Sequence, residues 1–205
     1  MGYGMTTELQ TEHEILKVCK YGDPVLRRKS EPITEITDDI RSLAEKMVHS
    51  MFRNDGIGLA APQVGVNIRL FTLATSVPGA ALRPDASPGE IQLAARMPLA
   101  LINPEIVSRS EHEETAEEGC LSLPGIYGNV TRPASVVLKT SLLTGETITV
   151  ECGHLLGRCI QHEIDHLDGV LFVDHLSEPE YLDLSGNLRR LKKHTRRELK
   201  KQQRR

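Results

Sequence analysis

With 205 residues, of which 39% are hydrophobic, the chain is long enough to bury the core of one globular domain, and only 3% of its residues are aromatic, so that core is largely aliphatic. No run approaches the roughly 18 apolar residues of a membrane span, and residues 1–15 lack the basic and apolar regions of a signal peptide, which predicts a cytoplasmic protein. The formal net charge is −3, but residues 189–205 hold ten basic side chains and one acidic one, so an acidic body carries a strongly basic tail.

The first predicted helix begins after Thr37, which can cap it, and ends near Asn54-Asp55-Gly56. Its apolar residues recur at helical spacing, namely Ile40, Leu43, Met47 and Met51. Residues 68–74 and 99–107 are predicted strands. The 24 residues between them, 75–98, contain four prolines and two glycines without a clear period, so we expect a long surface loop.

Residues 134–151 form two β-rich runs around Thr144-Gly145, which predicts a hairpin. The next predicted helix contains QHEIDHLDG, residues 161–169, and leucines at helical spacing in residues 184–199 predict a C-terminal helix with basic flanks. Helices mixed with short strands and hairpins favour an α+β fold. We expect short mixed or antiparallel β-sheets packed around the central helix, in a single catalytic domain of residues 1–188 followed by the tail, residues 189–205.

The middle of QHEIDHLDG is the pattern HExxH, which places His162 and His166 on one helix face where both can bind a divalent metal. A catalytic metal usually takes three protein ligands and keeps one position open, so a third ligand is needed. In the longer pattern HExxHxxGxxH the third histidine would stand where this chain has Phe172, which has no donor atom. Other downstream candidates fit the known spacings poorly; they are His175, Glu178 and Glu180.

Cys120, in the segment EEGCLSLPG, is the better candidate for the third ligand. A thiolate binds zinc strongly at about 2.3 Å, and one Cys with two His leaves a fourth position open. The other cysteines form no CxxC pair, so we expect small buried side chains without disulfides at Cys19, Cys152 and Cys159.

Three segments then carry a family resemblance: GIGLAAPQ at residues 56–63, EGCLS at residues 118–122 and QHEIDH at residues 161–166. In this order they resemble the three signature motifs of the peptide deformylases. The resemblance extends from about Ile15, through YGDPVLR, to about Leu176, and leaves the 75–98 loop and the tail as variable parts. It implies a metal-dependent hydrolase that removes the formyl group from N-formyl-methionyl peptides and releases formate.

The resemblance also implies a role for individual residues. Cys120 becomes the third metal ligand, and Glu163 becomes the base that takes a proton from the attacking water and passes it to the leaving amine. The Gln63 side chain and the backbone N–H of Leu121 would stabilise the negative oxygen of the intermediate. The implied metal is Fe²⁺, with Zn²⁺ as a common replacement and other divalent metals as further options.

The substrate peptide is expected to lie extended beside Ile57, Gly58 and Gly119. Two positions at the rim of this site depart from the family pattern. Tyr127 stands where some bacterial members carry an arginine, and Arg158 stands where some members are aliphatic. The chemistry is therefore easier to predict than the fine specificity.

Three other interpretations of the sequence remain open. They are a general metallopeptidase, a structural zinc module or ribosome-associated factor, and a formyl-peptide binder without turnover. The net charge of +9 on the tail, residues 189–205, predicts contact with ribosomal RNA, where formylated chains emerge, and the alternative is a solvated terminal helix.

Overall fold

The structure is a computed structural model of the chain and describes residues 14–77 and 79–202. Its helices are α1 (Asp38–Arg53), α2 (Pro88–Leu93), α3 (His154–Leu167) and α4 (Glu178–Gln202). Its strands are β1 (Gly58–Ala60), β2 (Leu70–Leu73), β3 (Leu99–Arg109), β4 (Glu113–Gly119), β5 (Tyr127–Pro133), β6 (Ser135–Leu142) and β7 (Thr147–Gly153). Short 3-10 helices are η1 (Pro24–Arg27), η2 (Ala61–Val64), η3 (Ala94–Arg96) and η4 (Phe172–Asp174).

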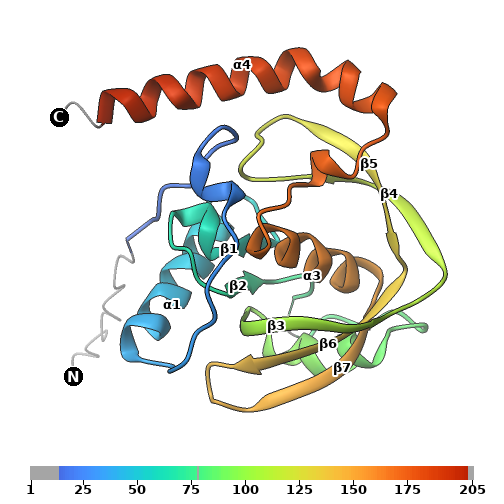
Figure 1. Cartoon of the computed structure of the whole chain (residues 1–205). Helices are drawn as coiled ribbons and strands as arrows, with labels where there is room; N and C mark the ends of the chain where they lie inside the picture. Colours follow the sequence, from blue (N-terminus) through green and yellow to red (C-terminus); the bar gives the residue numbers. More distant parts are fainter. Residues whose placement is uncertain (1–13, 78, 203–205) are drawn as a thin grey trace, which may run out of the picture.

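The strands form two antiparallel sheets around α3. One sheet has the order β1-β2-β3-β6-β7, and the other is the pair β4-β5. Figure 1 shows α3 in the centre, with α1 on one side of the molecule and α4 across the top. The expected α+β fold with a central HExxH helix is therefore confirmed.

Three hydrophobic clusters hold these elements together. The first packs one face of α3 against the five-stranded sheet, and the second packs α1 against β1, β2 and β3. The third lies under α4 and contains residues of η1, of the segment after β4 and of η4. Thus α3 is enclosed by packing, in agreement with its expected place at the centre of the fold.

The predicted first helix, the two strands after it and the hairpin all agree with the structure. Thr37 caps α1 by accepting a hydrogen bond from the Ile40 N–H, and Met47 and Met51 are fully buried. The hairpin pairs β6 with β7 around Thr144-Gly145, where Gly145 has a φ of 87°. These elements are decided by local signals, which explains why the sequence predicts them.

The prediction of a surface loop over residues 75–98 is wrong for its second half. Ser87 caps α2, and the Glu90 carboxylate accepts a hydrogen bond from the Ser87 N–H at 2.8 Å, which completes a capping box. Leu93 is fully buried in the first cluster. A Cβ on Gly89 would lie 2.5 Å from the Cys152 sulfur, so the absence of a side chain lets α2 pack on β7.

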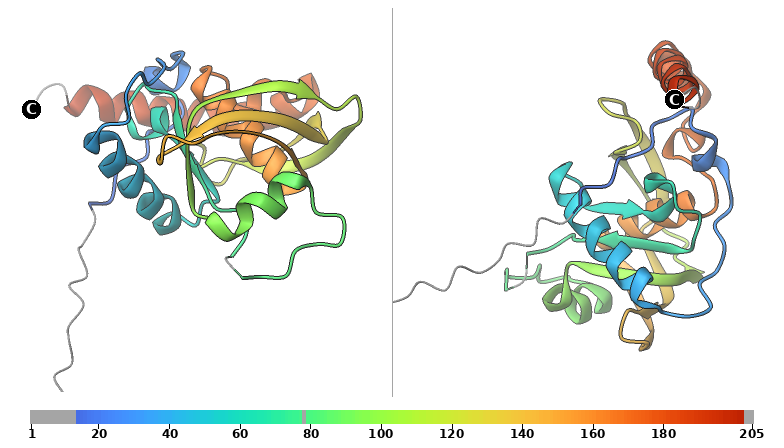
Figure 2. Two further views of the ribbon diagram at one scale, coloured as in Figure 1. Left: turned by 90° about the horizontal axis from the view of Figure 1, so that it is seen from below. Right: turned by 90° about the vertical axis from the view of Figure 1, so that its left-hand side faces the viewer.

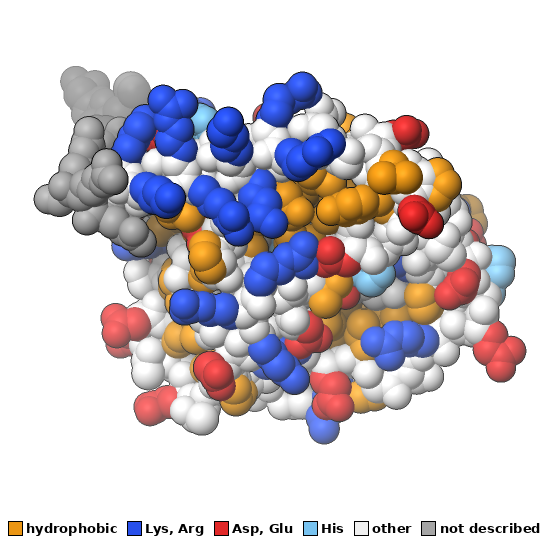
Figure 3. All heavy atoms as spheres, turned by 45° about the horizontal axis from the view of Figure 1, so that its top comes forward, with side chains coloured by type: hydrophobic (Ala, Val, Ile, Leu, Met, Phe, Trp, Pro, Cys, Tyr) orange, Lys and Arg blue, Asp and Glu red, His pale blue; other side chains and the backbone are white. Residues whose placement is uncertain are grey.

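Helix α4 runs without a break across the expected boundary between residues 188 and 189. Its inner side carries Leu188, which is 2% exposed, together with the partly buried Leu184 and Leu191, and these contact the third cluster. Figure 2 shows the helix lying along the body, and Figure 3 shows Lys and Arg side chains gathered along it. The predicted C-terminal helix with an apolar stripe and basic flanks is therefore present over the described residues.

In the part of the chain that the structure describes, no helix is long and apolar enough to cross a membrane. The expectation about a missing signal peptide concerns residues 1–15, of which 1–13 lie outside the described residues, as do residues 203–205 of the tail. All four cysteines are free, and Cys152 and Cys159 are buried as expected, whereas Cys19 is only half-buried.

Candidate metal centre

Three side chains come close together, two from α3 and one from the segment after β4. Cys120 follows β4, and His162 and His166 come from successive turns of α3, where a spacing of four residues puts both rings on one face. The donor atoms of the three residues all lie within 4.8 Å of one another, and Cys120 Sγ is 3.2 Å from His166 Nε2. This is the arrangement that one divalent ion needs from three ligands.

The chemistry of this donor set fits a metal. Burial alone would raise the pKa of the Cys120 thiol, but the imidazoles of His166 and His162 hold that pKa well below its usual value. The sulfur is therefore poised as a thiolate, the form that binds metal. A Cys/His/His set occupies three positions of a tetrahedron and leaves one for water or substrate.

Glu118 orients His162 and was not predicted from the sequence. Its Oε2 lies 2.9 Å from His162 Nδ1, which leaves Nε2 to face the other two donors. The carboxylate is itself held by Arg132 through bonds of 2.7 and 3.0 Å and by Arg158 at 2.9 Å. Burial opposes ionisation, yet His162 and Arg132 hold the pKa of Glu118 well below its usual value.

The downstream candidates for the third ligand lie elsewhere. His175 Nε2 is 2.8 Å from the Asp165 carboxylate, and Glu180 accepts a hydrogen bond from the Ser177 hydroxyl at 2.7 Å. Glu178 is an exposed residue at the start of α4. Over residues 14–77 and 79–202, Cys120, His162 and His166 are the one group whose geometry suits a metal ion.

Glu163 lies next to the three proposed ligands, and its carboxylate is buried. It is 3% exposed, and its Oε2 has no hydrogen-bond partner among the described residues. Burial raises the pKa of Glu163 to about 7, against the opposing effect of the two histidines. A carboxylate with such a pKa takes up and releases protons near neutral pH, as a general base must.

Gln63 faces the same space from η2. Its Oε1 accepts a hydrogen bond from the Ala60 N–H at 2.8 Å, which fixes the orientation of the amide. The Nε2 group then points to Ser122 Oγ at 3.2 Å and to Cys120 Sγ at 3.4 Å. The amide N–H groups are thereby directed at the Ser122 hydroxyl and at the sulfur of the metal-binding group.

One cavity of about 610 Å³ joins these residues. Every predicted site residue lines it except His166, which is 1% exposed. The lining residues among the predicted set are Ile57, Gly58, Gln63, Gly119, Cys120, Leu121, Tyr127, Arg158, His162 and Glu163.

The predicted peptide-binding residues flank the cavity on two strands. In the described sheets β1 pairs only with β2, and β4 pairs only with β5, so each strand has one edge without a partner. Gly58 lies on β1, and Gly119 ends β4 under the ring of Tyr127, which is 57% exposed. Such edges can bind an extended peptide through its main chain.

Arg158, an expected substrate contact at the rim, lines the cavity and also forms hydrogen bonds within the protein. Its guanidinium donates hydrogen bonds to Glu118, to the Val130 carbonyl at 2.9 Å and to the Glu114 carbonyl at 2.7 Å. The charged end is therefore used within the protein, between α3 and the β4-β5 sheet.

Comparisons with known proteins agree with this geometry. Residues 15–181 match the family described as polypeptide deformylase. Peptide deformylase 2 of Gloeobacter violaceus is 48% identical over 161 residues, which cover 78% of this chain and 79% of that protein. The peptide deformylase of a Synechococcus strain is 43% identical over 187 residues, which cover 91% and 85%.

Solved structures give the same answer. The crystal structure of peptide deformylase from Thermotoga maritima has a TM-score of 0.69 at 36% identity and covers 80% of this chain and 99% of its own. Peptide deformylase 1B of Arabidopsis thaliana, solved with an inhibitor, has a TM-score of 0.75 at 33% identity and covers 89% and 93%. The chain therefore belongs to the peptide deformylase family, metal-dependent hydrolases that remove the N-formyl group from newly synthesised peptides.

Proposed function

We propose that Cys120, His162 and His166 hold the catalytic metal of this deformylase and that Glu163 is its general base. One observation supports this assignment above the others. A Cys/His/His group and a buried carboxylate whose Oε2 has no partner among the described residues meet beside a single cavity. A structural metal site would need neither that carboxylate nor the open cavity.

A divalent metal held by the three ligands supplies a Lewis acid that lowers the pKa of water and polarises a carbonyl. Glu163 takes the proton of the attacking water and delivers it to the amine nitrogen when the C–N bond breaks. Gln63 Nε2 and the Leu121 N–H donate to the formyl oxygen as it becomes negative, and one such donor lowers the barrier by about 2.7 to 4 kcal/mol. Formate and a free amino terminus leave the site.

The peptide is proposed to lie extended between the free edges of β1 and β4. Main-chain groups near Ile57, Gly58 and Gly119 are then available to pair with it, which fits an enzyme that accepts many downstream sequences. Tyr127 and the aliphatic part of Arg158 line the same cavity, so they are proposed to contact the peptide side chains.

Fe²⁺ is the proposed metal, with Zn²⁺ as a common replacement. A Cys/His/His set binds zinc strongly by affinity order, so availability in the cell decides which ion occupies the site. Protein purified without oxygen should contain about one iron per chain and release formate from a short formyl-methionyl peptide. Unformylated casein serves as the control substrate. Casein cleavage without formate release would instead favour a general metallopeptidase.

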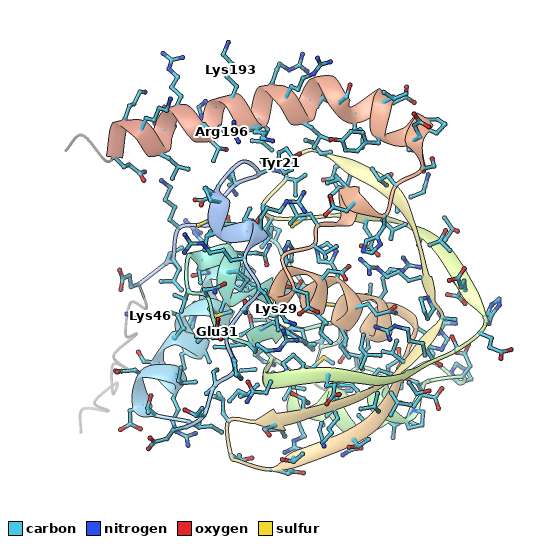
Figure 4. The ribbon with its side chains drawn as sticks, viewed as in Figure 1. Tyr21, Lys29, Glu31, Lys46, Lys193 and Arg196 are labelled. Carbon is cyan, nitrogen blue, oxygen red and sulfur yellow. The ribbon has the colours of Figure 1, made fainter. Side chains whose placement is uncertain are left out.

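The tail is proposed to contact ribosomal RNA in the cytoplasm, as a basic extension of the single catalytic domain of residues 1–188. Figure 4 shows Lys193 pointing from α4 away from the body, and Tyr21, in the segment before η1, beneath the helix. Basic side chains of α4 that are exposed, among them Lys193 and Arg197, are available to phosphates, whereas Leu188 is used in packing. Removal of α4 from Leu188 onwards would also remove a side chain that is 2% exposed and so would disturb the body.

Substitutions that remove charge but keep α4 avoid this disturbance of the body. Three exposed cations of α4 are changed to Gln in one variant, and three exposed cations of the body are changed to Gln in a matched variant with the same net charge. The first set is Lys193, Arg197 and Lys200, and the second is Arg53, Arg109 and Lys139. Sedimentation with ribosomes at low salt should fall for the α4 variant only, and equal binding by both variants would support the solvated-helix alternative.

A further inference from the structure

Three successive residues near the amino terminus connect the two sides of the proposed oxyanion site. The Cys19 N–H donates to the Gln63 carbonyl at 2.7 Å, and the Tyr21 N–H donates to the Ser122 carbonyl at 2.8 Å. Between them, Lys20 Nζ donates to the Leu121 carbonyl at 2.7 Å. We name residues 19–21 the strap. Gln63 and Leu121 are 58 positions apart in the sequence, and the strap donates hydrogen bonds to the carbonyls of both.

We propose that Lys20 is a positioning residue for the reaction, because its ammonium group holds the Leu121 carbonyl and thereby keeps the Leu121 backbone, with its N–H, in place beside the formyl oxygen. This inference rests on the proposed function, in which the Leu121 N–H is one of the two oxyanion donors.

The geometry around Leu121 explains why its carbonyl needs an anchor. The peptide group between Leu121 and Ser122 is held at both ends, since its oxygen accepts from Lys20 and its N–H donates to Cys120 Sγ at 3.4 Å. Cys120 immediately precedes Leu121 and is a proposed metal ligand. The Leu121 N–H belongs to the preceding peptide group, whose Cys120 carbonyl accepts from the Leu123 N–H at 2.9 Å. Lys20 therefore acts on the N–H through the Leu121 backbone, because it fixes the peptide group on the other side of the Leu121 Cα.

Lys20 is well placed for this task by its environment. It is half-buried, it lines the cavity, and its hydrogen bond goes to a backbone carbonyl rather than to a carboxylate. Its positive charge therefore stays close to the place where the formyl oxygen becomes negative. The strap is covered by α4, because a Cβ on the adjoining Gly22 would lie 2.9 Å from the Lys192 backbone and the Lys192 ammonium lies 6.0 Å from the centre of the Tyr21 ring.

The expected fall in kcat can be estimated from the effect of removing or misplacing one oxyanion donor. Removal of one oxyanion donor costs about 10²- to 10³-fold in kcat, and misplacement of a donor by about 1 Å costs up to about 10²-fold. Lys20→Met keeps most of the side-chain volume but removes the donor. We expect kcat to fall by about 10- to 100-fold with KM within about twofold of wild type, since ground-state binding of the peptide does not use this contact.

The test uses full-length, metal-loaded protein and three variants. Lys20→Met removes the contact, and Lys20→Arg restores a positive donor of similar length. Lys17→Met, a change of an exposed lysine on the same segment, is the matched control and should behave as wild type. Formate release gives kcat and KM, and metal content is measured on the same samples. Lys20→Arg should recover most of the kcat lost in Lys20→Met.

Several results would overturn the role of Lys20. Wild-type kcat in Lys20→Met would do so, and so would a higher KM at unchanged kcat, because Lys20 would then contact the peptide directly. Loss of metal in proportion to kcat would mean that Lys20 only stabilises the Cys120 segment. A wild-type protein that releases no formate would overturn the proposed function itself, and this inference with it.

Discussion

Gly58→Ala tests the position of Glu163 without touching its chemistry. A Cβ at residue 58 would lie 2.2 Å from Glu163 Oε1, 2.8 Å from its carboxyl carbon and 3.0 Å from Cys159 Sγ. Ordinary van der Waals contact begins at 3.4 Å, so the carboxylate must move by about 1 Å. Gly58 is therefore required by the close approach of β1 to α3 at the site of the proposed base.

We expect Gly58→Ala to lower kcat far more than it lowers the stability of the fold. The nearest atoms belong to the end of a flexible side chain, and Glu163 Oε2 has no hydrogen bond within the described residues that would resist the movement. A displacement of about 1 Å is nevertheless enough to lower the rate by up to about 10²-fold, because proton transfer requires the base within hydrogen-bond reach of the water. Binding of the metal should not change, since no ligand atom is displaced.

Three measurements check this prediction: kcat for formate release, metal content and the midpoint of thermal unfolding. Gly186→Ala is the control, because a Cβ there would meet no atom within 4 Å and the residue lies in α4, away from the cavity. If Gly58→Ala kept wild-type kcat, Glu163 could not be the base in this position. A variant that lost metal together with activity would also refute the reasoning.

Glu163→Gln should lower kcat by about 10²- to 10⁴-fold with full metal content, because it keeps the shape of the side chain but removes the base. Cys120→Ala should lose most of its metal, since only two imidazoles remain, as measured by metal analysis after dialysis. Leu188→Ala should lower the free energy of unfolding by about 2 to 5 kcal/mol in urea titrations, because it leaves a cavity under α4. Burial raises the pKa of Cys152 to about 12, so iodoacetamide at pH 8 should label it about 10³-fold more slowly in the folded than in the unfolded protein.

Each of these has a result that contradicts it. Near-normal turnover of Glu163→Gln would remove its role as base, and a metal-loaded, active Cys120→Ala protein would reopen the search for the third ligand. Unchanged urea midpoints for Leu188→Ala would mean that α4 does not pack on the body. Equal labelling of Cys152 in both states would mean that the thiol is not enclosed by β7 and α2.

The sequence predicted elements whose signals are local. Helix α1 has a capping residue, Thr37, and the β6-β7 hairpin has a Thr-Gly turn. The HExxH motif indicates metal binding, because its two histidines are four residues apart. Helix α2 was missed because six residues are too few to show a period, although Ser87 and Glu90 form a readable capping box. Strand β4 was missed because its sequence, EETAEEG, lacks the alternation typical of a half-buried strand.

The family and the residue types of the chemistry can be predicted from the sequence, because each motif that supplies a ligand, base or donor is short and contiguous. The tertiary structure alone decided how those motifs meet. In the sequence, Glu118 is one acidic residue among several, and only the fold places Arg132, Arg158 and His162 around it. Lys20 likewise resembles any surface lysine, because its partner, the Leu121 carbonyl, is 101 positions away. Burial and long-range hydrogen bonds arise only when distant segments pack together, and so they leave no local pattern in the chain.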